Sequence, residues 1–599
     1  MVKWHHLPED PMGGSTGEAY FGTLNNNSYS SEERLARESL QNSRDAVSKD
    51  GKLKVEYKFA KFTGQKKKSF VEALNLSSLT DRKQLMGLKG DNCLDHLGNG
   101  GTPIHVLYIS DYNTHGLYGS LQDRAGHFRR FLFTLGDRTK SREGSTVSGG
   151  SYGFGKAVYA LSSKVHIIVA YSRFDEKPDS GISARLMGAG FHKPYDQGRH
   201  QYNGRSIFGQ PGQGTDGKKL YDAISGDQAH ELAEQLGFKK RNQEESGTSI
   251  LILDPLVKPA DLVRGIETWW WPASLGNTMD VTVVDEDNVT QVPKPSSRPD
   301  LRPFIDTFNI ANGVSEPLGK HQDVSDWSRL GGCEIGTAAV TLLDESTQKL
   351  MPEERLNSIA MIRGPRMVAF YCPIKGAGAS IAGAYVASKD VEDWLRTSEP
   401  PAHDVWAAAS ADLADVPAAG LAINAIHARL KSFCGAFRKG ASPLPDGSRK
   451  SLRIFETMLG RLFRNRSKGK PSPPSGTAAP VHITFHGQPL PQAITGKGDV
   501  IKFATSFSLS LDNEFAESTA QIKVRLNCSI VEDEGIHGDP LPVRAHVRGG
   551  TLKEENGSYV GQLEKNKPIR FEVESEPYDR MWSVQFVPEV EVAVEGEDK

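Results

Sequence analysis

Short runs rich in apolar, β-branched and aromatic residues alternate with helical segments through the first half of the chain. They are KLKVEYKFA from Lys52, PIHVLYISD from Pro103, KVHIIVAYSR from Lys164 and GTSILILD from Gly247. Each run has the length and the β-branched and aromatic content of a strand. Strands that alternate with helices predict a mixed sheet with helices packed on it. We therefore expect an α+β fold for residues 1–254.

A helix is predicted from Glu33 to Val47, because apolar residues recur there at helical spacing. Ser30 can cap its first turn, and Glu33, three residues on, completes a capping box. The apolar face that should be buried consists of Leu35, Ala36, Leu40, Ala46 and Val47.

Glu38, Asn42 and Asp45 share another stripe of this helix, at i, i+4 and i+7. Two carboxylates and an amide beside a buried face are costly unless a ligand binds them. A nucleotide with its metal would do so, with Asn42 as an oxygen ligand of Mg²⁺, Glu38 as the base or orienter of an attacking water, and Asp45 near the nucleotide. A solvated polar face is the alternative, and the helix alone favours it.

The glycine-rich segment GGSYGFGKAVYALSS, from Gly149 to Ser163, fits two enzyme motifs incompletely. A P-loop is disfavoured because Ala157 stands where a Ser or Thr should reach Mg²⁺. A hydrolase nucleophile elbow around Ser151 requires a strong strand before it, and the preceding SREGSTVSG is a poor strand.

A third pattern needs only a flexible loop followed by a helix. Gly150, Gly153 and Gly155 can form a backbone nest that leads into a helix from Lys156 to Ser162. Such a nest at a helix N-terminus suits a polyphosphate. A plain glycine-rich turn is the alternative.

The rest of the chain predicts a lid and four further regions. Residues 112–150 are polar and glycine-rich, which predicts a lid with a short helix around Arg124 to Leu135. Residues 255–401 predict a second α/β unit, with the strand-like MIRGPRMVAFYCP near Met361 and a cluster from Trp269 to Trp271 that we expect in a core or between units. Helical sequence follows at 402–465, a Pro-, Ser- and Gly-rich linker at 466–480, and short alternating strands typical of a β-sandwich at 481–599.

Composition and charge narrow the class of protein. The formal net charge of −2 gives no support for nucleic-acid binding. The five cysteines show no CxxC pairing, so neither a zinc finger nor a disulfide framework is expected. The N-terminus has no apolar signal region, and no apolar run is as long as a membrane span. We expect a soluble, cytoplasmic protein without membrane contact.

The order of these features resembles that of the GHKL ATPase superfamily, which includes gyrase B, Hsp90-type chaperones, histidine kinases, MutL and MORC proteins. The likeness covers roughly residues 1–260. Its first motif is matched by Glu38, Asn42, Asp45 and Ala46, its third by Gly150, Gly153 and Gly155, and its fourth by Gly247 and Thr248.

The second motif is matched only in part. Asp111 is present, but Asn113 and His115 stand where the family usually has glycines, and Gly116 replaces one of these. The start of the lid therefore departs from the family pattern.

The resemblance implies a Bergerat-type α/β sandwich that binds ATP and Mg²⁺. By similarity, Asp111 accepts a hydrogen bond from the adenine amino group and Thr248 supports this contact. Asn42 holds Mg²⁺, and Glu38 polarises the attacking water. Further nucleotide contacts are expected from Asp45, Asn113, Gly116, Gly150, Ser151, Tyr152, Gly153, Phe154, Gly155 and Lys156.

The likeness is closest to the GHL branch and its prokaryotic MORC-like and MutL-like ATPases, and the phrase SEPPAHDVW from Ser398 adds to it. About thirty residues before the first motif are too few for the phosphoacceptor hairpin of a histidine kinase. Residues 255–401 then correspond to a transducer domain, which sends a basic residue to the γ-phosphate. Arg363, Arg366 and Lys375 are candidates among which the sequence does not choose, and Arg363 and Lys375 join Glu38 in the expected catalytic set.

By this resemblance, ATP binding closes the lid and joins two copies into a homodimer. A protein partner is expected to carry the effector activity, in a DNA-related or antiviral defence complex. Two other classes stay open: a nucleotide-binding scaffold without turnover, and, remotely, a serine hydrolase using Ser151.

Overall fold

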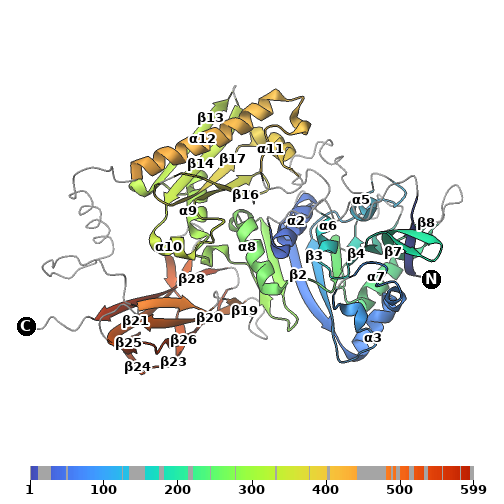
Figure 1. Ribbon diagram of the computed structural model, residues 1–599, viewed down its shortest axis with the longest axis horizontal. Helices are drawn as coiled ribbons and strands as arrows, with labels where there is room; N and C mark the ends of the chain where they lie inside the picture. Colours follow the sequence, from blue (N-terminus) through green and yellow to red (C-terminus); the bar gives the residue numbers. More distant parts are fainter. Residues whose placement is uncertain are drawn as a thin grey trace, which may run out of the picture.

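The computed structural model describes most of the chain, and all that follows concerns these residues. They are 2–10, 29–48, 52–88, 90–123, 126–133, 156–174, 181–212, 220–242, 244–276, 278–330, 333–376, 378–400, 405–441, 481–486, 490–493, 500–511, 518–531, 537–555, 557–579 and 582–593. The architecture is α+β, as expected, with several mixed or antiparallel sheets (Figure 1).

The first sheet contains all four strands that the sequence predicts in the first half. These are β2 (Leu53–Phe62), β3 (Ile104–Tyr112), β4 (Ile167–Arg173) and β10 (Gly247–Leu253). Along the sheet the order is β1 (Lys3–Pro8), β7 (His200–Gly212), β5 (Ala184–Phe191), β4, β10, β3, β2, β11 (Met279–Val284) and β12 (Thr290–Gln291). Neighbours in this order are antiparallel except β2 and β11, which are parallel.

Helices cover both faces of the first sheet, which explains why β3 is buried at nearly every position. Leu107 and Ile109 face α2 (Ser31–Asp45), α6 (Ala157–Leu161) and α8 (Pro259–Leu275). Val106 and Tyr108 face α3 (Gly64–Ala73) and α7 (Asp227–Gln235) on the other side. We call this sheet with its helices the first unit. Since β11 and β12 pair within it, the expected boundary after residue 254 cuts through the unit.

The second unit is built on a five-stranded sheet in the order β13 (Gln322–Leu330), β14 (Cys333–Leu342), β17 (Ile381–Ala387), β15 (Ser358–Arg363) and β16 (Met367–Pro373). The segment MIRGPRMVAFYCP, expected as one strand, is instead the β15–β16 hairpin, with Arg366 at a φ of 59° in the turn. Helix α9 (Arg302–Ala311) packs on one face. Helices α11 (Glu392–Ser398) and α12 (Pro417–Ala441) pack on the other.

One apolar core joins the two units, with α8 at its centre. In Figure 1, α8 lies between α2 of the first unit and β16 of the second. Trp269, Trp270 and Trp271 on α8 are all buried in this core, which confirms their predicted packing role. The two units are therefore not independent bodies, because a shared core resists relative sliding.

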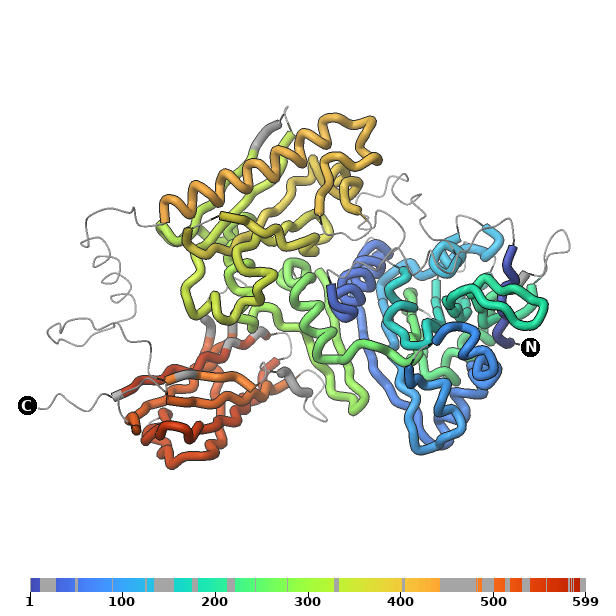
Figure 2. The backbone as a smooth tube through the Cα atoms, in the orientation of Figure 1, coloured from blue at the N-terminus to red at the C-terminus, as the bar shows by residue number. Residues whose placement is uncertain are grey.

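The C-terminal region is a β-sandwich with its own core. One sheet is β18 (Val481–Phe485), β20 (Val500–Leu511), β26 (Ile569–Ser575) and β23 (Val543–Arg548). The other is β22 (His537–Pro540), β21 (Thr519–Val531), β25 (Ser558–Glu564) and β24 (Leu552–Glu555), with β28 (Ser583–Ala593) also paired to β21. Figure 2 shows the sandwich in orange and red beside the rest of the chain. One contact between them is a hydrogen bond from the Val584 amide to the Ser297 hydroxyl, at 3.2 Å.

Two expectations lie partly or wholly outside the described residues. Helical sequence was predicted for 402–465, and the structure describes α12 up to Ala441; the predicted linker at 466–480 lies outside the described residues.

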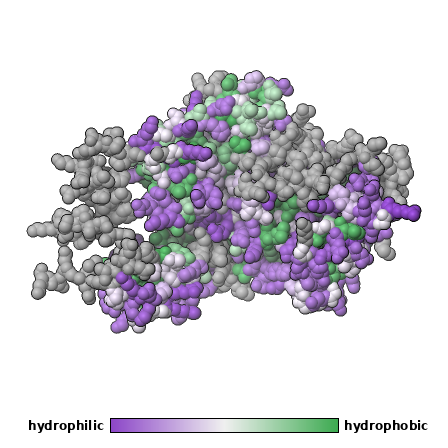
Figure 3. Space-filling view, in the orientation of Figure 1, coloured by the Kyte–Doolittle hydropathy of each residue, from purple (hydrophilic) through white to green (hydrophobic). Residues whose placement is uncertain are grey.

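The visible surface of the sandwich is mainly hydrophilic in Figure 3. None of the helices in the described ranges combines the length and the apolar character that a bilayer crossing requires.

Candidate functional site

Helix α2 places the Glu38, Asn42 and Asp45 stripe at the border of the buried core. The Glu33 amide donates to the Ser30 hydroxyl at 3.3 Å and the Ser30 amide to Glu33 Oε2 at 3.1 Å, which confirms the predicted capping box. Leu35, Ala36 and Leu40 are fully buried, whereas the three stripe residues are half-buried. The helix ends at Asp45 rather than at Val47, because Val47 forms a bridge with Thr114.

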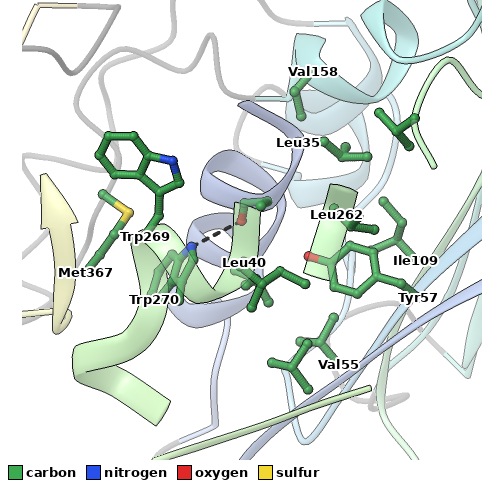
Figure 4. Close-up of a cluster of buried hydrophobic side chains, with 14 of the residues drawn as sticks. Leu35, Leu40, Val55, Tyr57, Ile109, Val158, Leu262, Trp269, Trp270 and Met367 are labelled. Carbon is green, nitrogen blue, oxygen red and sulfur yellow. Dashed lines mark hydrogen bonds between the residues drawn. The ribbon is translucent and has the colours of Figure 1, made fainter. Parts of the chain in front are cut away.

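The core behind this stripe fixes the position of α2. In Figure 4, α2 lies against the aromatic residues of α8, and Trp270 Nε1 donates to the Ala36 main-chain oxygen at 3.1 Å. On the sheet side, the Ser39 hydroxyl is 2.6 Å from the Tyr57 hydroxyl. Contacts on both sides leave the helix little freedom to rotate, so its polar stripe keeps one direction.

Asp111, at the end of β3, connects three elements that are distant in sequence. Its Oδ1 accepts hydrogen bonds from the Thr248 amide on β10 at 2.8 Å and from the Thr114 hydroxyl at 2.6 Å. Its Oδ2 accepts one from the Ser43 hydroxyl on α2 at 3.2 Å. The structure therefore brings together Asp111 and Thr248, as expected, and adds Ser43 and Thr114, which sequence reasoning missed.

Two glycines allow the backbone to close around Asp111. A Cβ on Gly247, which has a φ of 147°, would overlap the Asp111 main-chain oxygen and lie 2.9 Å from its Oδ1. A Cβ on Gly116, at a φ of 67°, would overlap the Arg173 main-chain oxygen. A side chain at either position would need both a strained backbone and displaced neighbours. Gly116 and Gly247 are therefore positions at which the observed backbone requires glycine.

Asn113, also expected at the nucleotide, has its side chain engaged elsewhere. It is exposed, with a φ of 62°, and its Nδ2 donates to the Lys52 main-chain oxygen at 2.7 Å. The side chain thus fastens the loop to the start of β2. Asn tolerates this left-handed backbone conformation better than most residues do.

Helix α6 faces α2 through Tyr159, which sequence reasoning also missed. Burial raises the pKa of Tyr159, an effect that Asn42 opposes and that Asp111 and Glu38 strengthen. These four side chains therefore converge on one region between α2, α6 and β3. The Asn42 side chain interacts with the Tyr159 hydroxyl, and its buried Nδ2 makes no further hydrogen bond among the described residues. An amide with unused hydrogen-bonding capacity indicates a binding position for a polar ligand.

The glycine loop cannot be compared with its predicted role. Gly150, Ser151, Tyr152, Gly153, Phe154 and Gly155 lie outside the described residues. Lys156, the residue that follows them, is half-buried, and its Nζ donates to the Arg130 main-chain oxygen in α5 (His127–Phe133). The predicted helix after the loop is α6, and the predicted lid helix is α5.

The three basic candidates of the second unit occupy different surroundings. Arg363 is 2% exposed and is bound by Glu399 at 2.6 Å and Glu392 at 2.9 Å. Burial alone lowers the pKa of Arg363, but the two carboxylates outweigh it and raise the pKa. Lys375 is exposed, beyond the end of β16 that lies away from the hairpin turn.

Arg366 is the candidate that lies beside α2. It sits in the β15–β16 turn, where its guanidinium approaches Gly276 at the end of α8. Burial lowers the pKa of Arg44, in the last turn of α2, and the neighbouring Arg366 lowers it further. The expected catalytic roles of Arg363 and Lys375 therefore have less geometric support than one for Arg366, because Arg363 is neutralised and Lys375 is distant along the hairpin.

A second polar stripe of α2 faces this hairpin. Arg37, Gln41 and Arg44 precede Glu38, Asn42 and Asp45 by one residue each, at the same i, i+4 and i+7 spacing. Arg37 is 1% exposed and donates to the main-chain oxygens of Val368 at 3.2 Å and Ala369 at 2.9 Å on β16. A signal for this contact existed in the sequence, since a charged residue stands next to the apolar Leu35 and Ala36.

No protein-family model matches the chain, and no curated protein matches it. Among the described residues, no group of three or more His, Cys, Asp or Glu side chains is arranged to hold a metal ion.

Proposed function

We propose that the chain is a Mg²⁺-dependent ATPase of the GHKL type, with a Bergerat-type first unit and a transducer-like second unit. The observation that carries the proposal is the junction at Asp111, where α2, β3 and β10 meet through Ser43, Asp111 and Thr248. Asp111 of the second motif and Thr248 of the fourth meet there, and the helix that carries the first motif joins them through Ser43. Chance matches to short motifs have no reason to converge in space.

The residues at the junction suit a nucleotide. An Asp111 carboxylate oxygen can accept a hydrogen bond from the adenine amino group, because its existing donors leave lone pairs unused. Asn42 offers a polar group beside Glu38. Its Oδ1 would hold Mg²⁺, which commonly binds one or two protein ligands together with phosphates and waters, and its buried Nδ2 has capacity to donate to the nucleotide. When bound, Mg²⁺ and ATP supply the phosphoanhydride and the charge that activates it.

The remaining roles follow from position. Glu38, half-buried on the same stripe, would orient the attacking water and receive its proton. Arg366 is the basic residue that would approach the phosphates from the second unit. Asp45, Gly116 and Lys156 would add further contacts to the nucleotide, and the loop from Gly150 to Gly155 would enclose the phosphates.

Nucleotide binding would act as a conformational switch that closes the lid and joins two copies. The shared core through α8 supports this proposal, because a movement of α2 must also affect the second unit. The effector would be a protein partner in a DNA-related or antiviral defence complex in the cytoplasm. Direct nucleic-acid binding gains no support from the net charge of −2.

Two variants test the proposal. Glu38→Ala should bind Mg²⁺-ATP with unchanged affinity, measured by calorimetry, and release no phosphate. Asp111→Asn should lose about one to two orders of magnitude of affinity, since a hydrogen bond to a charged group contributes ~1.5–3 kcal/mol. Lys553→Ala, at an exposed site on the C-terminal sandwich, serves as the control for general effects. Unchanged binding and turnover in both test variants would place the site elsewhere.

The scaffold without turnover is the second candidate, because Asn113 is engaged by Lys52 rather than turned toward Asp111. Wild-type protein that binds ATP but releases no phosphate would select it. For the serine hydrolase, Ser151 lies outside the described residues, and a fluorophosphonate probe that fails to label the protein would exclude it.

A further inference from the structure

Arg241 is a buried cation directly behind the Asp111 junction. It is 4% exposed and follows α7 in the segment that leads to β10. Its Nη2 donates to the Asp111 main-chain oxygen at 2.7 Å and to the Ser249 hydroxyl at 2.9 Å. Since Ser249 is on β10 and Asp111 on β3, one nitrogen atom ties these two neighbouring strands together at the candidate site.

The guanidinium also borders the glycine that the junction requires. A Cβ on Gly247 would lie 2.8 Å from Arg241 Nη1 and 2.9 Å from Asp111 Oδ1. The two groups therefore flank the same point of the β10 backbone, one residue before the Thr248 amide that binds Asp111. On its other side, the Arg241 Cζ lies 4.6 Å from the centroid of the Tyr112 ring.

A charge in this position is costly to bury. Burial lowers the pKa of Arg241, and Asp111 is the strongest of the charges that oppose this shift. The Nε and Nη1 atoms have no hydrogen-bond partner among the described residues. An apolar side chain of similar size would often stabilise a fold as well or better. The cost is explained if the charge and its two hydrogen bonds serve the site.

We propose that Arg241 is a positioning residue that sets the preference of the site for a 6-amino purine. It fixes the main chain of Asp111 against β10, so that the carboxylate keeps the direction in which it accepts a hydrogen bond from the base. A purine with a 6-oxo group presents an acceptor to the same carboxylate and gains nothing from this alignment. This inference rests on the proposed nucleotide site and adds a residue that selects the base.

The test compares ATP with inosine triphosphate, which has an oxo group in place of the 6-amino group. Calorimetry with wild type should show a clear preference for ATP. Arg241→Met should lose about tenfold in ATP affinity and little in inosine triphosphate affinity. Arg241→Lys, which keeps the charge and a donor, should restore part of the preference. A merely structural role would weaken both nucleotides equally, because they share their phosphates.

Two controls locate the effect. Arg82→Met removes a partly buried arginine that contacts Tyr195 and Tyr202 elsewhere on the first sheet, and it should leave the preference unchanged. On an Asp111→Asn background, Arg241→Met should cause no further change in the ratio of the two affinities. A further loss of the same size would show that Arg241 acts independently of Asp111 and would overturn the inference.

A measurement without nucleotide separates this inference from the proposed function. Hydrogen exchange of a peptide that includes Thr248 and Ser249 should be about tenfold faster in Arg241→Met than in wild type, since the opened junction exposes the Thr248 amide. Unchanged exchange would overturn the positioning role even if ATP binds. If wild type binds neither nucleotide, the proposed function and the base preference both fail, while faster exchange would still support the structural link.

Discussion

Arg37 of α2 donates a hydrogen bond of 2.9 Å to the main-chain oxygen of Ala369, a residue 332 positions away on β16. Ala369 is the extra residue of an irregularity in the β15–β16 pairing, where Met361 faces Phe370 and Ile362 faces Val368. A bulge turns neighbouring carbonyl groups away from the ladder, and Arg37 binds two of them, Val368 and Ala369. The residue next to the proposed catalytic Glu38 is thereby fixed to the second unit.

The first prediction concerns this contact. Arg37→Met should lower the free energy of unfolding by about 2–3 kcal/mol, because two buried carbonyl groups lose a charged donor and the stacking on Trp269 is lost. At temperatures where the variant stays folded, phosphate release should fall while ATP affinity stays within about threefold. Urea titration and calorimetry measure the two effects. Arg34→Met, at a half-buried site on the same helix, is the matched control. Equal unfolding curves for Arg37→Met and wild type would contradict the prediction.

The second prediction separates stability from function at Asn42. Asn42→Ala should change the free energy of unfolding of the nucleotide-free protein by less than about 1 kcal/mol, because the amide interacts only with the Tyr159 hydroxyl and its buried Nδ2 has unused hydrogen-bonding capacity. Mg²⁺-dependent ATP binding should be lost in calorimetry. Ser39→Ala on the same helix should do the opposite, with about 1 kcal/mol less stability through the lost Tyr57 contact and normal binding. A strongly destabilised Asn42→Ala would mean that the amide serves the fold.

The third prediction distinguishes Arg363 from Arg366. Arg363→Met should destabilise the protein by about 3–5 kcal/mol, because it removes the guanidinium that compensates the charge of the buried Glu399 carboxylate. Arg366→Ala should fold normally and lose turnover, with little change in ATP affinity. Thermal unfolding and phosphate release measure the pair. A stable Arg363→Met with lost turnover would instead restore Arg363 as the residue that reaches the phosphates.

The fourth prediction tests the backbone at Gly247. Gly247→Ala should weaken ATP binding by at least about tenfold, because the new Cβ overlaps the Asp111 main-chain oxygen and forces β10 away from β3. Gly226→Ala is the control, since that glycine also has a positive φ of 62° but its Cβ would meet no atom within 4 Å. Both variants carry backbone strain, so only the first should change binding in calorimetry.

The fifth prediction is a pH dependence of stability from His192. Burial lowers the pKa of His192 to about 3, and its ring bonds the Val165 main-chain oxygen at 3.0 Å. The unfolded chain, with a histidine pKa near 6.5, therefore binds the proton more strongly than the folded chain. The free energy of unfolding should fall as the pH decreases below about 6.5, by up to about 1.4 kcal/mol per pH unit until about pH 3.

Denaturant titrations of wild type and His192→Gln between about pH 7 and pH 5 measure this effect. The variant should show a shallower decrease. His6, whose pKa burial lowers to about 4, should give a second and smaller contribution that His6→Gln removes. Parallel pH profiles for wild type and His192→Gln would show that the histidine does not titrate on unfolding.

Local sequence signals located most elements of the first unit. The capping box of Ser30 and Glu33 and the apolar spacing of Leu35 and Leu40 set the start and the buried face of α2. The β15–β16 hairpin was missed, because Arg366 adopts a left-handed backbone conformation that its residue type does not announce. The boundary after residue 254 was misplaced, because the parallel pairing of β11 with β2 joins segments that no local pattern connects.

The sequence by itself determined that Glu38, Asn42 and Asp45 share a stripe, because helical spacing depends only on residues within two turns. It also placed Asp111 and Gly247–Thr248 at the ends of their strands. Only the tertiary structure decided that these strand ends meet α2 through Ser43. It also decided that Arg37 binds α2 to β16 and that Arg241 binds the main chain of Asp111. The same holds for the surroundings of Arg363, which two carboxylates neutralise, and of Arg366, which lies beside α2. These contacts join residues separated by between 36 and 332 positions, and they exist only once the chain has folded around its core.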